Sequence, residues 1–293
     1  MDQYVHTNID LWELVCQPEP DKFDHVLPGL LAGTVGAIVS PGGVGKSWIS
    51  AQVLLQIATG KDLLGLGDVT TGAVAYLNAE DDMTAIRIRM WHLLQRLGPL
   101  VSAFQPQEGY APYFRLEALL GCAPCLLDAG GNKDEFWVDY VWKAAKGRRL
   151  LILDTLRKFH RADENSSAAM TDLTNLLDRI ARDTGCAILF CHHSNKLAMA
   201  DGRGDEAGAS RGSSALVDNI RWQWNLVRMT PAEQKEFGID DASRKRWMRL
   251  VGAKNNNGEE LSDLWLYKGA NGVPESHVLK KIEKERKNGR EKA

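Results

Sequence analysis

The chain runs Ala37-Ile38-Val39-Ser40-Pro41-Gly42-Gly43-Val44-Gly45-Lys46-Ser47, from a short apolar segment into a glycine-rich turn. The β-branched content of the apolar segment predicts a strand, and an amphipathic helix is expected from the end of the turn to about Thr59. Glycines allow such a turn to curl until its N–H groups converge on a phosphate, with the positive end of the helix behind them. The pattern therefore predicts a phosphate-binding loop; the alternative is a chance glycine-rich turn.

The loop assigns nucleotide contacts by residue type. Lys46 is expected to reach the β- and γ-phosphates, and the Ser47 hydroxyl is expected to ligate Mg²⁺. Ser40 stands where the first glycine of the pattern usually lies. The full predicted contact set is Ser40, Gly42, Gly43, Val44, Gly45, Lys46, Ser47 and Trp48. We expect the chain to bind ATP with Mg²⁺.

Composition limits the alternatives. The 293 residues suit one large α/β domain with an appendage, or two small domains, and 44% apolar content is ordinary for a globular protein. No window is long and apolar enough to span a membrane, and the amino terminus lacks the pattern of a secretion signal. Five cysteines fit a reduced, cytoplasmic chain. With a net charge of −2, any contact with nucleic acid must come from a local loop or from loops gathered by oligomerisation.

An acidic cluster follows the next predicted strand, residues 73–78. Ligands of open α/β sheets bind at the carboxyl ends of strands, so Glu80 is expected to polarise the water that attacks the γ-phosphate. The alternative is that Glu80, Asp81 and Asp82 only begin the following helix, where the dipole favours acidic side chains. We expect Asp81 or Asp82 to fill that helical role.

Two further apolar strands end in polar residues. Residues 150–153 precede Asp154, which is expected to position Mg²⁺. Residues 186–191 precede His192 and His193. One of the two histidines is expected to sense the γ-phosphate, with His193 preferred, and the other to be structural.

Cys122 and Cys125 have the spacing of a metal or redox pair. No second pair accompanies them, and proline within such a pair is common in loops. A loop is therefore favoured over a zinc site.

Residues 195–209 are rich in glycine and alanine and lack periodicity, which predicts a long functional loop. Lys196, Arg203 and Arg211 are candidates for contact with DNA phosphates. The acidic residues of the same segment offset them, so a single copy is expected to bind DNA weakly.

The remaining segments outline the domain. An alternating strand at 220–227 and a hairpin at 246–268 predict a mainly parallel sheet flanked by helices, with an antiparallel carboxyl-terminal edge. We expect an amino-terminal helical extension (1–32) capped by Asn8, a core (33–270) and a charged, disordered tail (271–293). The short extension helix could pack on its own core or on a neighbouring subunit.

In this order, the phosphate loop, Glu80, Asp154 and the His192-His193 strand end resemble the RecA-like ATPase core. More specifically, the chain resembles the RepA-type hexameric replicative helicases of broad-host-range plasmids. The segments that carry this resemblance are Gly33–Ser47, Ala79–Asp81, Leu153–Arg157, Phe159-His160, Asp183–Cys186, Ala209–Ser214 and Val217–Gln223.

The resemblance implies a homo-hexameric ring with ATP at each interface, moving 5′→3′ along single-stranded DNA and unwinding forked duplex. By it, Glu80 is the catalytic base, Arg89 contacts the adenine and His193 senses the γ-phosphate. Arg221 is the finger inserted into a neighbour's site, and Lys254 is a second candidate for that contact. Separate initiator and primase chains are expected. Two other classes stay open, a strand-exchange recombinase and a non-translocating ATP-dependent loader or switch.

Overall fold

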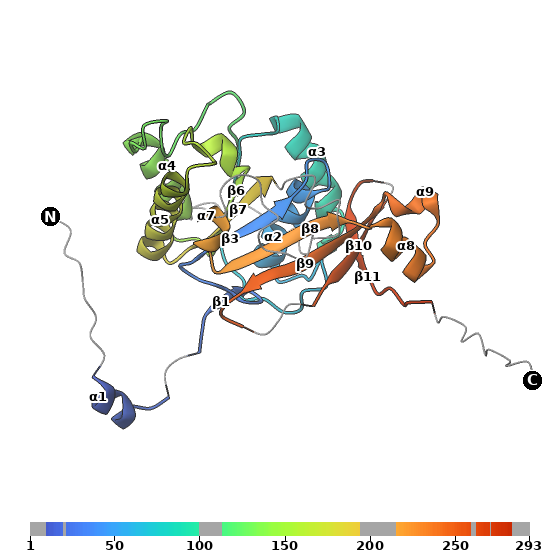
Figure 1. The fold of residues 1–293 in the computed structure, drawn as a ribbon, viewed down its shortest axis with the longest axis horizontal. Coiled ribbons are helices and arrows are strands. Elements are labelled where there is room, and N and C mark those ends of the chain that lie inside the picture. The colour runs from blue at the N-terminus through green and yellow to red at the C-terminus, as the bar shows by residue number, and fades with distance from the viewer. Residues whose placement is uncertain are drawn as a thin grey trace, which may run out of the picture.

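A nine-stranded sheet forms the centre of the molecule (Figure 1). The computed structural model describes residues 10–19, 22–99, 113–193, 215–258, 262–269 and 271–282. Across the sheet the strand order is β11-β10-β9-β8-β3-β7-β6-β4-β5.

The sheet is parallel over most of its width and antiparallel at one edge. The parallel strands are β3 (Val35–Ser40), β4 (Val74–Asn78), β5 (Phe114–Ala118), β6 (Leu150–Asp154), β7 (Ala187–His193) and β8 (Trp222–Arg228). The antiparallel edge is built from β9 (Trp247–Asn255), β10 (Leu264–Lys268) and β11 (Pro274–His277). The fold class predicted from the sequence is confirmed.

Helices cover both faces of the sheet. Helices α4 (Glu135–Ala145) and α5 (Ser167–Thr184) pack on one face, and α2 (Lys46–Thr59) and α3 (Met83–Leu94) lie on the other (Figure 1). Because side chains alternate along each strand, neighbouring residues enter different cores. Within β3, for example, Val39 faces α5 and Ile38 faces α2. The parallel strands therefore read as unbroken apolar runs.

Helix α2 differs from the amphipathic helix that we predicted, because it is buried on nearly every side. Its polar residues Gln52 and Gln56 are also buried, and their side-chain amides donate to the carbonyls of Pro274 and Gly67 at 2.9 Å each. The segment that follows the helix and the last strand of the sheet thus enclose it. The helix that carries the phosphate loop is anchored in the core.

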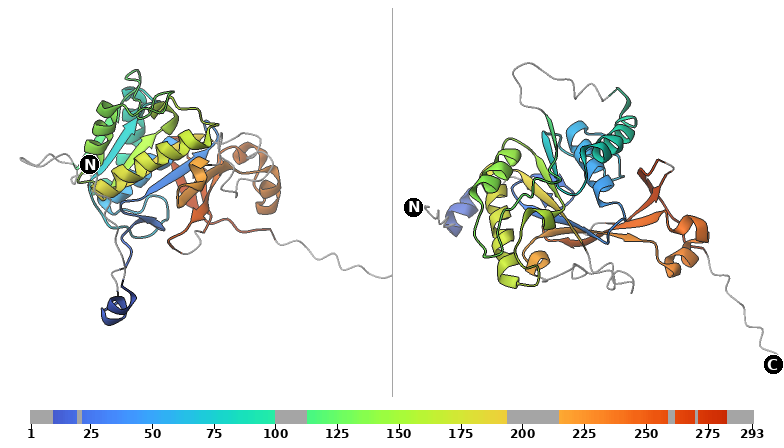
Figure 2. Two further views of the ribbon diagram at one scale, coloured as in Figure 1. Left: turned by 60° about the vertical axis from the view of Figure 1, so that its left-hand side comes forward. Right: turned by 90° about the horizontal axis from the view of Figure 1, so that it is seen from above.

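The amino-terminal part divides at a different place from the predicted boundary at residue 32. The hairpin of β1 (His25–Leu27) and β2 (Leu30–Leu31) packs on the core, with Val26 and Leu30 fully buried. Helix α1 (Leu11–Cys16), by contrast, stands apart from the body (Figure 2). Its cap is Asp10, which accepts from the Trp12 N–H, so the predicted Asn8 cap is wrong for the described helix; Asn8 itself lies outside the described residues.

The carboxyl-terminal region also differs from the prediction. The predicted tail begins inside the sheet, because β11 pairs with β10 from Pro274 to His277. Nearby, α8 (Pro231–Phe237) begins with a capping box between Thr230 and Glu233, and α9 (Asp241–Arg244) follows. A 3₁₀ helix, η2 (Leu156–Phe159), follows β6, and α7 (Ala215–Asp218) lies further along the chain. In the part of the chain that the structure describes, no helix is long and apolar enough to cross a membrane.

Candidate nucleotide-binding site

The turn between β3 and α2 has the backbone shape of an anion-binding loop. Gly43 has a φ of 74° and Gly45 a φ of 141°, conformations that glycine adopts without strain. The first backbone bonds of α2 run from the Trp48 and Ile49 N–H groups to the Gly45 carbonyl. Among the described residues, the backbone N–H groups of Lys46 and Ser47 therefore have no backbone acceptor. Free N–H groups at a helix amino terminus are suited to binding an anion.

Lys46 folds back over the loop and is almost fully buried. Its Nζ donates to the Ser40 carbonyl at 3.2 Å and to the Ser40 hydroxyl at 3.3 Å. Burial lowers the pKa of the Lys46 ammonium. An incoming phosphate would supply the negative charge that these neutral acceptors lack.

His193 joins Lys46 to Glu80. Its Nδ1 lies 3.3 Å from Lys46 Nζ, and its Nε2 lies 3.7 Å from Glu80 Oε1. Because an ammonium only donates, Nδ1 must accept, which places the proton of the neutral ring on Nε2, facing Glu80. The His193 ring lowers the pKa of the Glu80 carboxyl. This contact follows from the register, since Ser40 lies beside His193 in the ladder of β3 and β7; His192 is buried beneath the site.

Asp154 is fully buried at the end of β6. The Tyr76 hydroxyl donates to its Oδ2 at 2.5 Å, and Asn78 Nδ2 lies 3.4 Å from the same oxygen. Within the described ranges Oδ1 has no hydrogen-bond partner. Burial raises the pKa of the Asp154 carboxyl, an effect that the Tyr76 and Ser47 hydroxyls partly offset. A buried carboxylate oxygen without a donor suits a cation.

Asn78 fixes the turn that carries Glu80. Its Oδ1 accepts from the Glu80 N–H at 3.0 Å and from the Asp81 N–H at 2.7 Å. Our sequence analysis missed both Asn78 and Tyr76. Their alternate spacing at the end of β4, a strand that pairs with β6, was the available signal, but the pairing is known only from the fold.

The predicted base contact Arg89 is held beside the loop helix. Its Nη2 lies 2.9 Å from Asp81 Oδ2, and its guanidinium carbon lies 5.7 Å from the centre of the Trp48 ring. On another side of Trp48, a Cβ added to Gly272 would lie 3.3 Å from the ring, so the turn between β10 and β11 packs against it. Asp82, not Asp81, caps α3.

Arg221 and Lys254 lie away from the phosphate loop of their own chain. Trp222, the first residue of β8, pairs with Gly36, whereas the loop follows Ser40 at the other end of β3. Lys254 lies beside Gln223 in β9, and its Nζ donates to the Val217 and Asp218 carbonyls at 3.1 and 3.0 Å. Arg221 is exposed and has no ion pair among the described residues. Lys254 therefore lies away from the phosphate loop of its own chain, and its candidate role in a contact with a neighbouring subunit stays a prediction.

The predicted DNA contacts Lys196, Arg203 and Arg211 lie outside the described residues. Cys122 is exposed and Cys125 is buried, with the Cys125 thiol 3.2 Å from the Leu127 carbonyl. No group of three or more metal-binding side chains occurs in the described parts of the chain.

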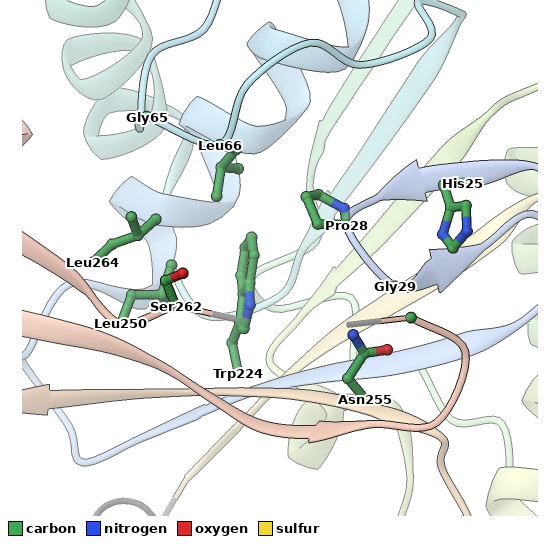
Figure 3. Close-up of a pocket in the computed structure, with 11 residues that line it drawn as sticks. His25, Pro28, Gly29, Gly65, Leu66, Trp224, Leu250, Asn255, Ser262 and Leu264 are labelled. Carbon is green, nitrogen blue, oxygen red and sulfur yellow. The ribbon is translucent and has the colours of Figure 1, made fainter. Parts of the chain in front are cut away.

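A cavity of about 520 Å³ lies away from this site (Figure 3). The hairpin residue Pro28 and the strand residues Trp224 and Leu250 contribute to its walls. The phosphate loop contributes none of its lining residues.

The residues at the strand ends fit a nucleoside triphosphate with Mg²⁺. They combine free N–H groups at a helix terminus, a buried lysine, a hydroxyl and a buried carboxylate oxygen without a donor. Together with the mainly parallel sheet, they define a RecA-like phosphate-loop ATPase. The family model described as an AAA domain matches residues 8–199, about two thirds of the chain. The chain belongs to this family.

Solved structures agree on the fold. A DnaB-like replicative helicase, reported with its interactions with primase, gives a TM-score of 0.58 at 12% identity over 90% of this chain. The match spans 65% of that helicase. The RadB recombinase gives 0.50 at 13% identity, covering 83% of this chain and 91% of its own. A KaiC-like protein, PH0186 from Pyrococcus horikoshii OT3, gives 0.51 at 11% identity, covering 88% and 99%.

Proposed function

We propose that the protein is an ATP-driven replicative DNA helicase. It forms a hexameric ring of the RepA type, translocates 5′→3′ on single-stranded DNA and unwinds duplex during plasmid or phage-like replication. The choice of a helicase within the RecA-like fold rests on the sequence resemblance described above.

The observation that carries the proposal is the position of Arg221. This exposed arginine lies at the end of the parallel strands opposite to the phosphate loop, so it cannot reach its own nucleotide. For Arg221 to act as the finger that the resemblance implies, the nucleotide has to come from a second copy of the chain. An arginine finger acting in trans requires an assembly in which one subunit's strand end faces the next subunit's loop. Lys254, which pairs with Gln223 two residues further along, is the second candidate for this contact.

The roles proposed for the residues of each site are as follows. Lys46 and the loop residues 40–48 bind the phosphates, and Ser47 and Asp154 hold Mg²⁺. Glu80 positions the attacking water. His193, which lies between Lys46 and Glu80, senses the γ-phosphate. Arg89 contacts the base.

Helix α1 is proposed to dock on a neighbouring subunit. Its apolar side chains are exposed to solvent. A helix of six residues has little stability of its own and needs a surface to pack on. Trp12→Ser is therefore expected to shift the assembly from hexamers toward smaller species, measured by light scattering after size exclusion with an ATP analogue. Phe136→Ser is the matched control, since Phe136 is 66% exposed on α4 and Trp12 is 76% exposed. An unchanged mass for Trp12→Ser would show that α1 does not hold the assembly together.

The DNA contacts are proposed to come from the loop that contains Lys196, Arg203 and Arg211. Six copies of a weak contact in one central channel would multiply its strength. An initiator and a primase are proposed as separate chains that act with the helicase in the cytoplasm.

Strand displacement on forked DNA tests the function. With ATP and Mg²⁺, the wild type is expected to unwind the fork, and Lys46→Ala is expected to lower the rate at least about a hundredfold because the phosphates lose their buried cation. Lys143→Ala removes an exposed lysine of α4 as the control. Forks that carry only one of the two tails report the polarity.

The other outcomes identify the alternatives. Hydrolysis stimulated by single-stranded DNA without unwinding would favour a strand-exchange recombinase, which electron microscopy would show as helical filaments. Hydrolysis that is indifferent to DNA would exclude both DNA-dependent classes and favour a loader or switch.

A further inference from the structure

Arg228 contacts the phosphate loop from outside it. Strand β8 runs past the end of its neighbour, because Asn225 pairs with Val39 and β8 continues for three more residues alongside β9. Arg228 therefore lies level with the loop that follows β3. Its Nη2 donates to the Gly43 carbonyl at 3.0 Å.

This guanidinium has no acidic partner among the described residues, and its side chain is exposed. Beneath the loop, Met248 and Leu226 from the same two strands approach Gly45, where an added Cβ would lie 3.6 Å from the Met248 sulfur. The paired strands β8 and β9 thus support the loop from below, and Arg228 is its polar contact from the side.

The contact controls the direction of an N–H group. The only cis peptide in the described residues joins Asp154 to Thr155, so the peptide between Gly43 and Val44 is trans. In a planar trans peptide the carbonyl and the following N–H point in opposite directions. When Arg228 holds the Gly43 carbonyl on its side, the Val44 N–H is held on the other side of the loop.

Gly43 needs such a constraint. Glycine rotates between positive and negative φ more freely than any other residue, so the 43–44 peptide of a free loop would turn. An anion-binding loop depends on several N–H groups pointing at one position at once. Fixing them before the ligand arrives removes an entropic cost from binding.

We propose that Arg228 is a positioning residue that clamps the 43–44 peptide and so preorganises the phosphate loop. It acts through the Gly43 carbonyl and not by touching the nucleotide. The proposal rests on nucleotide binding by this loop, which is part of the proposed function, but not on helicase activity.

Calorimetric titration with Mg·ADP, a non-hydrolysable Mg·ATP analogue and AMP tests the clamp. Arg228→Met keeps most of the side-chain length but removes the donor. It is expected to weaken ADP and the ATP analogue equally, by about tenfold, the value of one hydrogen bond from a charged donor at the surface. AMP, which lacks the β-phosphate, is expected to change less than twofold.

Arg244→Met is the matched control, because Arg244 also donates to a backbone carbonyl, that of Met229 at 3.1 Å, but away from the loop. It is expected to bind all three nucleotides like the wild type. Arg228→Lys retains a donor and is expected to recover most of the affinity, which guards against misfolding of the methionine variant.

Three results would overturn the clamp. The first is unchanged nucleotide binding by Arg228→Met. The second is a loss of affinity confined to the ATP analogue, which would mean that Arg228 contacts the γ-phosphate directly. The third is an equal loss of affinity in Arg244→Met. Failure of the proposed function gives a different result, in which Lys46→Ala binds ADP as well as the wild type does.

Discussion

The Glu80→Gln variant is expected to hydrolyse ATP at least about a hundredfold more slowly than the wild type while it binds ATP with unchanged affinity. Positioned general bases contribute factors of about 10² to 10⁴, and an amide cannot accept the proton of the attacking water. The His193 ring lowers the pKa of the Glu80 carboxyl, so the base is ionised at neutral pH. Glu80 lies outside the loop that is proposed to bind the phosphates, so we expect the affinity for ATP to be unchanged.

Phosphate release and calorimetry measure the two quantities separately. Glu135→Gln, on the exposed first turn of α4, is the control for loss of one carboxylate. A variant with the wild-type hydrolysis rate would remove Glu80 from the mechanism, and a parallel loss of ATP binding would indicate a structural role.

The second large effect is expected at Asp154, where Asp154→Asn should raise the Mg²⁺ concentration for half-maximal hydrolysis at least about tenfold. The oxygen of the new amide can still accept from Tyr76, which leaves its NH₂ group where Oδ1 now has no donor. The hydrogen atoms of this NH₂ group would then point toward the Mg²⁺ position and would repel the cation. The charge required for Mg²⁺ binding would also be lost.

The same variant is expected to be more stable than the wild type in a chelator. Burial raises the pKa of Asp154 despite hydrogen bonds from Tyr76 and Ser47, so the folded protein without metal carries an incompletely compensated charge that the amide lacks. We expect a rise in melting temperature of about 2–3 °C, the shift for about 1 kcal/mol. Asp139→Asn is the control for loss of one carboxylate, because Asp139 is exposed on α4, where it pairs with Lys143 at 2.7 Å. A wild-type Mg²⁺ dependence would contradict the metal role of Asp154. A lower melting temperature would contradict the cost that we assign to its buried charge.

Local signals predicted the centre of the site. The loop from Ser40 to Ser47 is contiguous, and Asp154 and His193 each end an apolar strand, so each could be found without knowing its neighbours. Their association follows from a general rule, since the carboxyl ends of parallel strands meet at one edge of a sheet. The same rule explains why the fold class was predictable.

Residues that act through pairing could not be predicted. Tyr76 and Asn78 are polar positions in an apolar strand, and only the register of β4 against β6 brings them to Asp154. Arg228 is 185 residues from Gly43 along the chain, and nothing local marks it. The short strands β1 and β2 were missed because two or three residues carry no measurable periodicity.

Strand β8 carries one of the proposed functional arginines at each of its ends. Strand β8 begins beside Arg221 and ends at Arg228, seven residues later, a span of about 23 Å at 3.3 Å per residue. In an assembly where Arg221 serves a neighbour, the strand is a stiff rod between two nucleotides, the chain's own at one end and the neighbour's at the other. Because β8 is paired with β3 on one side and β9 on the other, the distance between these two ends is fixed within each chain.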